Sequence, residues 1–79
     1  MRRDARDNRE AIVATARDLF SRAGADVSMR AIAKEAGVGV ATVSRHFPER
    51  EDLVQAVVDA VYADFRAAVE KHVPGMETD

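Results

Sequence analysis

A chain of 79 residues, 47% of them hydrophobic and with only four glycines and two prolines, has the size of one small helical domain. The absence of cysteine excludes a disulfide framework, a thiolate nucleophile and a cysteine-ligated zinc site. No apolar run approaches the length of a membrane span, and the charged N-terminus is followed by no signal-peptide core. We therefore expect a soluble, cytoplasmic protein with no membrane partner.

The net charge of −2 is unevenly distributed along the chain. Residues 1–50 hold ten Lys and Arg against seven Asp and Glu, a balance of +3, whereas residues 51–79 hold two against seven, a balance of −5. This charge distribution is typical of a protein in which one half of the chain faces nucleic acid and the other half has a different function.

The first residues of the chain are rich in arginine. Four arginines and no large apolar side chain fall within residues 2–9, which predicts a flexible basic arm over residues 1–8. Two roles remain open for this arm. It contacts a DNA minor groove, or it is a solvated lead-in whose charge Asp4 and Asp7 dilute.

A first amphipathic helix is predicted from about Asn8. Its apolar stripe has the spacing i, i+4, i+7 and i+8 and consists of Ile12, Ala16, Leu19 and Phe20, with Val13 beside it. Asp7 or Asn8 is expected to cap the start of the helix, and Gly24 to end it. Because the stripe is single, we expect this helix to pack across the helices that follow.

A second, short helix is predicted next. Apolar residues recur at i, i+3, i+4 and i+7, as Met29, Ile32, Ala33 and Ala36. Ser28 is placed to accept a hydrogen bond from an amide of the first turn, with Val27 packing before it. Gly37 is placed where a left-handed backbone ends a helix.

A third helix follows after a turn of two residues. Val43 and Phe47 share one face of it at i and i+4, and Pro48 ends it. Two short helices set at an angle by a Gly-containing turn have the design of a helix-turn-helix, whose second helix enters the DNA major groove. The alternative is an ordinary corner between two helices. The polar side chains favour DNA binding, because the third helix is expected to expose Thr42, Ser44, Arg45 and His46 and no acidic residue.

The fourth helix is predicted to run from Arg50 to about Val73, since nothing breaks the pattern before Pro74. Four apolar residues are expected to close the core of the head: Leu53, Val54, Val57 and Val61. Five more have nothing in this chain to cover them: Val58, Tyr62, Phe65, Val69 and Val73. Such a surface indicates a partner or a further domain. The alternative is a terminal helix that frays.

No arrangement of side chains indicates an enzyme or a cofactor. His46 and His72 are expected on separate helices, and neither has a second ligand at metal spacing. The sequence contains no Gly-rich phosphate loop and no activated nucleophile.

Residues 9–53 resemble the N-terminal DNA-binding domain of TetR-family transcriptional regulators. The resemblance rests on the Ala-x-x-Leu-Phe pattern at residues 16–20, on Gly24, on the Ile-Ala-x-x-Ala-Gly-Val pattern at residues 32–38, and on residues 41–52. It implies an all-α fold with a three-helix head, residues 9–53, and a long fourth helix, residues 54–79 leading to an effector and dimerisation domain. The segment Thr-Val-Ser-Arg at residues 42–45 is similar to the LacI-type helix-turn-helix, but a full amphipathic helix precedes it here.

The resemblance also implies the DNA contacts. The family's groove and phosphate contacts fall on Ser28, Arg30, Gly39, Val40, Thr42, Ser44, Arg45, His46 and Arg50. Amides at the starts of the second and fourth helices are suited to hold phosphates. The family usually has a phosphate-anchoring tyrosine at the position of Ser44, and the serine hydroxyl has a shorter reach.

The function expected from these observations is a sequence-specific regulator, a repressor, that binds a palindromic operator as a homodimer. A small-molecule effector is expected only if the second domain exists, and the chain is either a fragment of such a regulator or a stand-alone head. A protein-interaction module that acts through the long fourth helix is the alternative.

Overall fold

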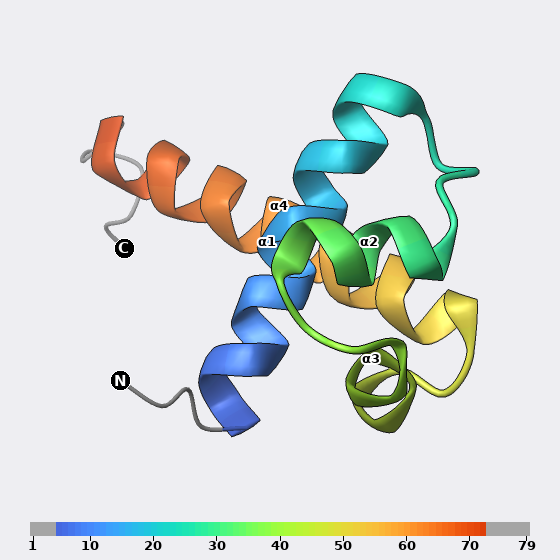
Figure 1. The fold of residues 1–79 in the computed structure, drawn as a ribbon. Coiled ribbons are helices and arrows are strands. Elements are labelled where there is room, and N and C mark those ends of the chain that lie inside the picture. Colours follow the sequence, from blue (N-terminus) through green and yellow to red (C-terminus); the bar gives the residue numbers. More distant parts are fainter. Residues whose placement is uncertain (1–4, 73–79) are drawn as a thin grey trace.

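The computed structural model describes the backbone of residues 5–72 and the side chains of residues 6–71. The described part of the chain forms four helices and contains no strand, so the all-α class is confirmed. The helices are α1 (Ala5–Ala23), α2 (Met29–Ala36), α3 (Val40–His46) and α4 (Arg50–His72). In Figure 1, α1 crosses the centre of the molecule, with α2 at the level of its middle, α3 beside its N-terminal half and α4 behind it.

Helix α1 begins earlier than the sequence pattern predicted. It starts at Ala5, so residues 5–8 are helical and do not belong to a flexible arm. The helix extends because residues 5–8 contain nothing that breaks it, and alanine and arginine are strong helix formers. Neither Asp7 nor Asn8 caps the start; Asp7 lies in the first turn, where its charge suits the positive end of the helix dipole. Residues 1–4 of the predicted arm lie outside the described residues.

Both predicted ends of α2 are confirmed. The Oγ of Ser28 accepts a hydrogen bond from the Ala31 N–H at 3.0 Å, with Ser28 in extended backbone geometry. Gly37 has φ +77°, and its N–H donates to the Lys34 carbonyl at 3.2 Å. The predicted stop of α1 is likewise present, since Gly24 has φ +94° and donates to the Phe20 carbonyl at 2.9 Å. These local signals fix where α2 begins and ends.

Replacing Ser28 with alanine is expected to destabilise the fold by about 1 kcal/mol, because the Ala31 amide loses its acceptor. For a domain of this size that corresponds to a fall in melting temperature of about 4–8 °C. Thermal unfolding followed by circular dichroism measures the change. Ser21→Ala is the matched control: its hydroxyl donates to the Asp18 carbonyl on the exposed side of α1 and caps nothing. Equal effects of the two substitutions would contradict the cap as the source of stability.

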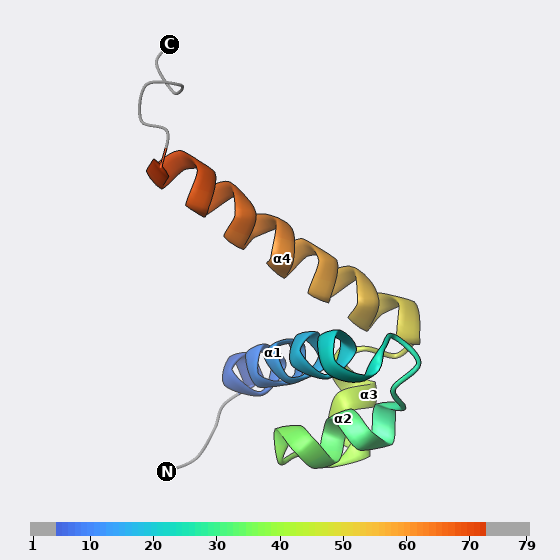
Figure 2. The same ribbon diagram turned by 90° about the horizontal axis from the view of Figure 1, so that it is seen from above.

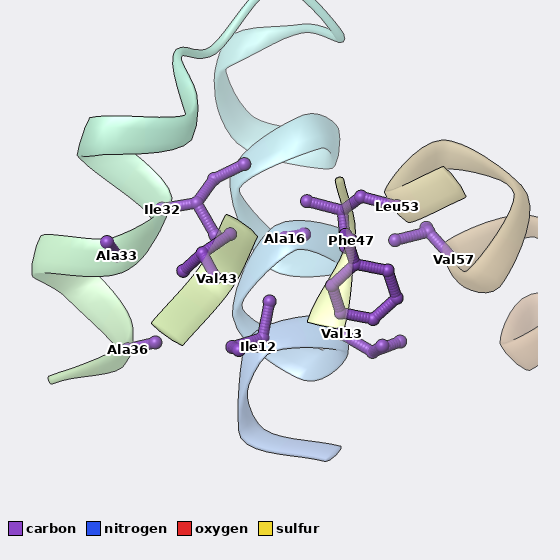
Figure 3. Close-up of a cluster of buried hydrophobic side chains, with 10 residues drawn as sticks. All are labelled: Ile12, Val13, Ala16, Ile32, Ala33, Ala36, Val43, Phe47, Leu53 and Val57. Atoms are coloured by element: carbon purple, nitrogen blue, oxygen red, sulfur yellow. The ribbon is translucent and has the colours of Figure 1, made fainter. Parts of the chain in front are cut away.

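One hydrophobic core joins all four helices (Figure 3). Its buried members are Ile12, Val13, Ala16, Ile32, Ala33, Ala36, Val43, Phe47, Leu53 and Val57. Leu19, Phe20, Val27, Met29 and Val38 are partly buried and pack against this cluster. Nearly every apolar residue that the helical spacing assigned to the head is therefore in or against the core.

Val54 and Val61 are the exceptions, because neither belongs to the core or packs against it, and the prediction that Val61 closes the core is wrong. The Val61 side chain is 44% exposed. Figure 2 shows that the axes of α1 and α4 diverge toward the C-terminal end of α4, and on the turn after Val57 it is Ala60, not Val61, that packs against the core. Val54 is only half-buried.

The far half of α4 carries the uncovered apolar surface that the sequence predicted. Val58, Tyr62, Phe65 and Val69 are all exposed, Phe65 by 63%. Val73 lies outside the described residues. The Nη1 of Arg17 on α1 lies 2.6 Å from the Oδ2 of Asp64, which links the two diverging helices. Because both side chains are exposed, this pair adds little stability.

Candidate nucleic-acid interface

Helix α3 is anchored to the head along one face only. Val43 is fully buried, and Phe47, which ends the helix, is 2% exposed. The Phe47 N–H donates to the Val43 carbonyl at 2.8 Å. An α-helix with its side chains is about 10–12 Å across, which a DNA major groove about 12 Å wide admits.

The outer face of α3 carries most of the side chains that were predicted as contacts. Val40, Ser44 and Arg45 are exposed, and Val40 is 44% exposed although it is apolar. Thr42 and His46 are only half-buried rather than fully exposed, because each flanks the buried Val43 or Phe47. No acidic residue lies within α3.

The start of α2 presents the next predicted contacts. Arg30 is exposed and, like Arg45, forms no ion pair among the residues that the structure describes. Ser28 is exposed and uses its oxygen as the cap, which leaves its O–H free to donate. Figures 1 and 2 both place α3 alongside α2, and the two helices are in direct contact. Gly39 precedes α3 in extended geometry and offers no side chain.

Arg50 is placed differently from the other predicted contacts. It opens α4, is half-buried, and donates from its Nη2 to the carbonyl of Ala25 in the loop between α1 and α2. Its guanidinium carbon also lies 5.8 Å from the centroid of the Phe20 ring. The side chain is thus engaged within the protein, on the loop that leads to α2.

The start of α4 is also less open to a phosphate than the sequence suggested. The Glu49 N–H donates to the Oδ2 of Asp52 at 3.1 Å, so one amide of this end already has an acceptor. Glu51 and Asp52 both lie in the first turn. Their negative charges oppose a phosphate at this end, in contrast to the start of α2, whose first turn has no acidic residue.

Arg9 is a positively charged residue that lies near α3. The sequence placed it near the start of the first helix and predicted no role for it. Its guanidinium carbon lies 5.1 Å from the centroid of the Phe47 ring, so it covers the residue that ends α3. The ring centroids of His46 and Phe47 are 6.2 Å apart. The spacing of residues within α1 does not reveal such a contact, because it joins helices that are distant in the sequence.

Residues 5–72 contain neither a metal-binding cluster nor a membrane-spanning helix. Within that range no three His, Cys, Asp or Glu side chains are grouped so as to hold a metal ion. His46 and His72 lie on α3 and α4, respectively. No helix in the same range is both long and apolar enough to cross a membrane.

Comparison with known proteins agrees with the geometry of the head. The model of the bacterial regulatory proteins of the tetR family matches residues 12–57, more than half of the chain. HTH-type transcriptional regulators of Staphylococcus aureus strains USA300, NCTC 8325 and COL are each 44% identical to this chain over 59 residues. The match covers 73% of this chain and 32% of each relative, so the chain spans about a third of the length of these relatives. No solved structure gives a significant match.

The matched range extends from the first buried residue of α1, Ile12, to the last buried residue of α4, Val57. It therefore coincides with the packed head and includes the whole of α2 and α3. The chain belongs to the tetR family of bacterial regulatory proteins, and its head is the N-terminal DNA-binding domain of that family.

Proposed function

We propose that this protein is a sequence-specific DNA-binding repressor that inserts α3 into the major groove. The observation that carries the proposal is the two-sided character of α3. Val43 and Phe47 fix its inner face in the core, while its outer face presents Val40, Ser44 and Arg45 without an acidic neighbour on the helix. A helix held in this way projects its side chains toward base edges at a defined depth.

The proposed contacts divide into base readout and phosphate positioning. Arg45 reads a guanine edge, since a guanidinium matches the two acceptors of guanine in the major groove. Val40 contacts a thymine methyl group, and Thr42 and His46 flank these two contacts. Ser28 and Arg30 hold a phosphate at the start of α2, where the helix dipole and the free amides favour an anion. Gly39 lets the backbone approach the groove closely.

Ser44 is proposed as a short phosphate or base contact. A serine hydroxyl extends less far than the phenol that the family usually has at this position. The lost anchor leaves Arg30 and Arg45 with a larger share of the docking, and both are free of ion pairs within residues 5–72.

The whole regulator is proposed to act as a homodimer on a palindromic operator. A helix-turn-helix dimer places its two recognition helices in successive major grooves, about 34–36 Å or a multiple of that apart. An effector that binds a further domain would change the separation of the heads through α4 and so shift the population away from the DNA-bound arrangement. Such a protein acts in the cytoplasm, where a bacterial regulator meets the chromosome.

The proposal is tested by selecting random duplex DNA with this chain at low salt, fused to a dimeric partner that restores avidity. The expected result is an inverted repeat whose half-sites are contacted by α3. Recovery of no motif by a correctly folded helical protein would refute sequence-specific binding.

Replacing Arg45 with alanine is expected to weaken binding to the selected site by about 1–3 kcal/mol and to relax the preference at one base position. The reason is the loss of a bidentate contact that no other side chain of α3 can supply. Binding to the selected duplex and to its single-base variants measures both effects. Arg66→Ala is the matched control, since Arg66 is exposed on the far half of α4 and lies 3.9 Å from Glu70. An unchanged base preference in the Arg45 variant would remove Arg45 from the readout.

The exposed apolar face of α4 favours a second candidate, a protein-interaction module that forms mixed dimers. Tyr62 and Phe65 are the most exposed large apolar residues of this face, at 62% and 63%. Salt dependence separates the two candidates. A DNA-binding protein displaces cations from the phosphates when it binds, and this displacement becomes less favourable as the salt concentration rises, so its affinity falls steeply. An interaction module shows no salt-dependent DNA binding.

A further inference from the structure

Arg9 reaches from α1 to the end of α3. Its guanidinium carbon lies 5.1 Å from the centroid of the Phe47 ring, within the distance of about 6 Å at which an aromatic face attracts a cation. Phe47 is 2% exposed, whereas Arg9 is exposed. The guanidinium therefore lies between the buried ring and the solvent, at the surface of the head.

The N–H groups of this guanidinium have no partner in the described part of the chain. Among residues 6–71, Arg9 donates no hydrogen bond and forms no ion pair. A guanidinium has five N–H donors, and contact of its face with a ring leaves its edge free. Because the ring of Phe47 is fixed in the core, the guanidinium on it is held as well, so less entropy is lost when it binds an anion.

The position of Arg9 complements that of the phosphate contacts already proposed. Figures 1 and 2 both show α3 between the start of α2, on its right, and the N-terminal end of α1, on its left. A helix in the major groove is flanked by the phosphates of two DNA strands. Ser28 and Arg30 are proposed to hold a phosphate on the side of α2. Arg9 lies on the side of α1, toward the other strand.

The charges at the end of α3 also favour an anion beside Arg9. The C-terminal end of a helix carries partial negative charge, so a phosphate can lie there only where cations outweigh it. Arg45 and His46 both belong to the last turn of α3, next to the Phe47 ring that Arg9 covers. Glu10 follows Arg9 in the sequence, but it points about 100° away around the axis of α1, where it lines the groove between α1 and α4.

We infer that Arg9 is a further DNA-contacting residue: its guanidinium, held on the Phe47 ring, binds a backbone phosphate beside the end of α3, across the groove from the phosphate at the start of α2. This inference rests on the proposed DNA-binding function. It adds a contact from α1, the helix of the head to which the family resemblance assigns none. A phosphate contact positions the head on DNA and carries no base preference.

The test uses the full 79-residue chain and a fluorescently labelled duplex of mixed sequence. The Kd is measured between about 20 and 80 mM salt for the wild type, Arg9→Gln, Arg9→Lys and Arg22→Gln, at a temperature at which circular dichroism shows each to be folded. Arg22→Gln is the matched control for the loss of one arginine charge from α1. Arg22 is exposed, pairs with Asp18 at 2.9 Å, and lies about 20 Å along the helix from Arg9.

Arg9→Gln is expected to raise the Kd about tenfold at the lower end of this salt range and about threefold at the upper end. The reason is that the loss of one phosphate contact reduces the slope of log Kd against log salt by about 0.9. Arg9→Lys should keep the slope of the wild type, since an ammonium group also binds phosphate as a point charge. Arg22→Gln should keep it as well.

An unchanged slope in Arg9→Gln would overturn the inference, whatever the change in melting temperature, because Arg9 would then only cover Phe47. An equal fall in slope in Arg22→Gln would overturn it too, since the slope would then report the net charge alone. A slope in Arg9→Lys as low as that in Arg9→Gln would do the same, because the lysine keeps the charge. Arg9→Met serves if Arg9→Gln does not fold: it keeps an unbranched stem over the ring without the charge, and the same slope is expected.

These failures are distinct from failure of the proposed function. If the wild type itself shows no salt-dependent binding to DNA, the DNA-binding function is refuted and this inference falls with it. If the wild type binds and Arg9→Gln has the same slope, the function stands and the contact from α1 alone is refuted.

Discussion

Phe47→Ala is expected to cost about 3–5 kcal/mol of folding stability, the largest effect of any single substitution considered. Phe47 is 2% exposed and ends α3, and Figure 3 shows its ring between the side chains of α1 and α4. A domain of this size has a total stability of about 4–12 kcal/mol. The variant should therefore be largely or partly unfolded at room temperature, as measured by urea denaturation followed by circular dichroism.

Phe65→Ala provides the matched control for this prediction. It is the same chemical change in the same fold, but Phe65 is 63% exposed on the far half of α4. The expected cost is within about 0.5 kcal/mol, since substitutions away from packed features have small effects. A cost for Phe65→Ala near that of Phe47→Ala would mean that the far half of α4 is buried in solution, by association with a second molecule.

The sequence predicted the core of the head well because local signals suffice for it. Ile12, Ile32 and Val43 each belong to the apolar face of a different helix, and any packing of three amphipathic helices must bury these faces. The ends of α2 were equally accessible, since the cap at Ser28 and the left-handed Gly37 act within one turn of the chain. Periodicity and caps are short-range features that a single sequence displays directly.

The sequence-based predictions were wrong where the structure depends on packing between elements that are distant in the sequence. Val61 continues the apolar stripe of α4, but the angle at which α4 crosses α1 leaves it 44% exposed, and no local pattern specifies that angle. The start of α1 at Ala5 was missed because residues 5–8 carry no apolar stripe, although nothing in them opposes a helix.

The sequence predicted which residues form the candidate site, but it predicted only in part how their side chains are arranged. The polar residues of α3 follow from its short length and from its anchoring by Val43 and Phe47. The placement of Arg50 on Ala25 and Phe20 joins residues 25 and 30 positions apart in sequence, and a family pattern that assigns a phosphate contact to this position does not contain it. Whether a basic residue binds DNA or the protein itself depends on which acceptor lies within reach in the fold.

Joining two heads into a dimer is expected to raise the affinity for the operator about 100- to 10,000-fold over that of a single head. One α3 of seven residues makes few contacts, so a single head binds its half-site weakly. A dimeric coiled coil fused through a short, semi-rigid linker after residue 79 makes the second binding event intramolecular and limits the relative orientation of the two heads, and no new contact with DNA is needed. Titration of the single chain and of the fusion against the selected inverted repeat measures the gain.

The rotational position of the two half-sites around the DNA helix gives a more specific form of this prediction. Two recognition helices reach the same face of DNA only when the half-site centres are separated by about 10 bp or a multiple of it. Inserting about 5 bp between the half-sites turns the second half-site to the opposite face, so most of the gain should vanish while single-head binding persists. A duplex with one half-site destroyed is the control and should bind the fusion nearly as weakly as the single chain does. If the fusion binds the phase-shifted duplex as tightly as the original, the gain comes from non-specific attraction to phosphates, and the two α3 helices do not read an operator together.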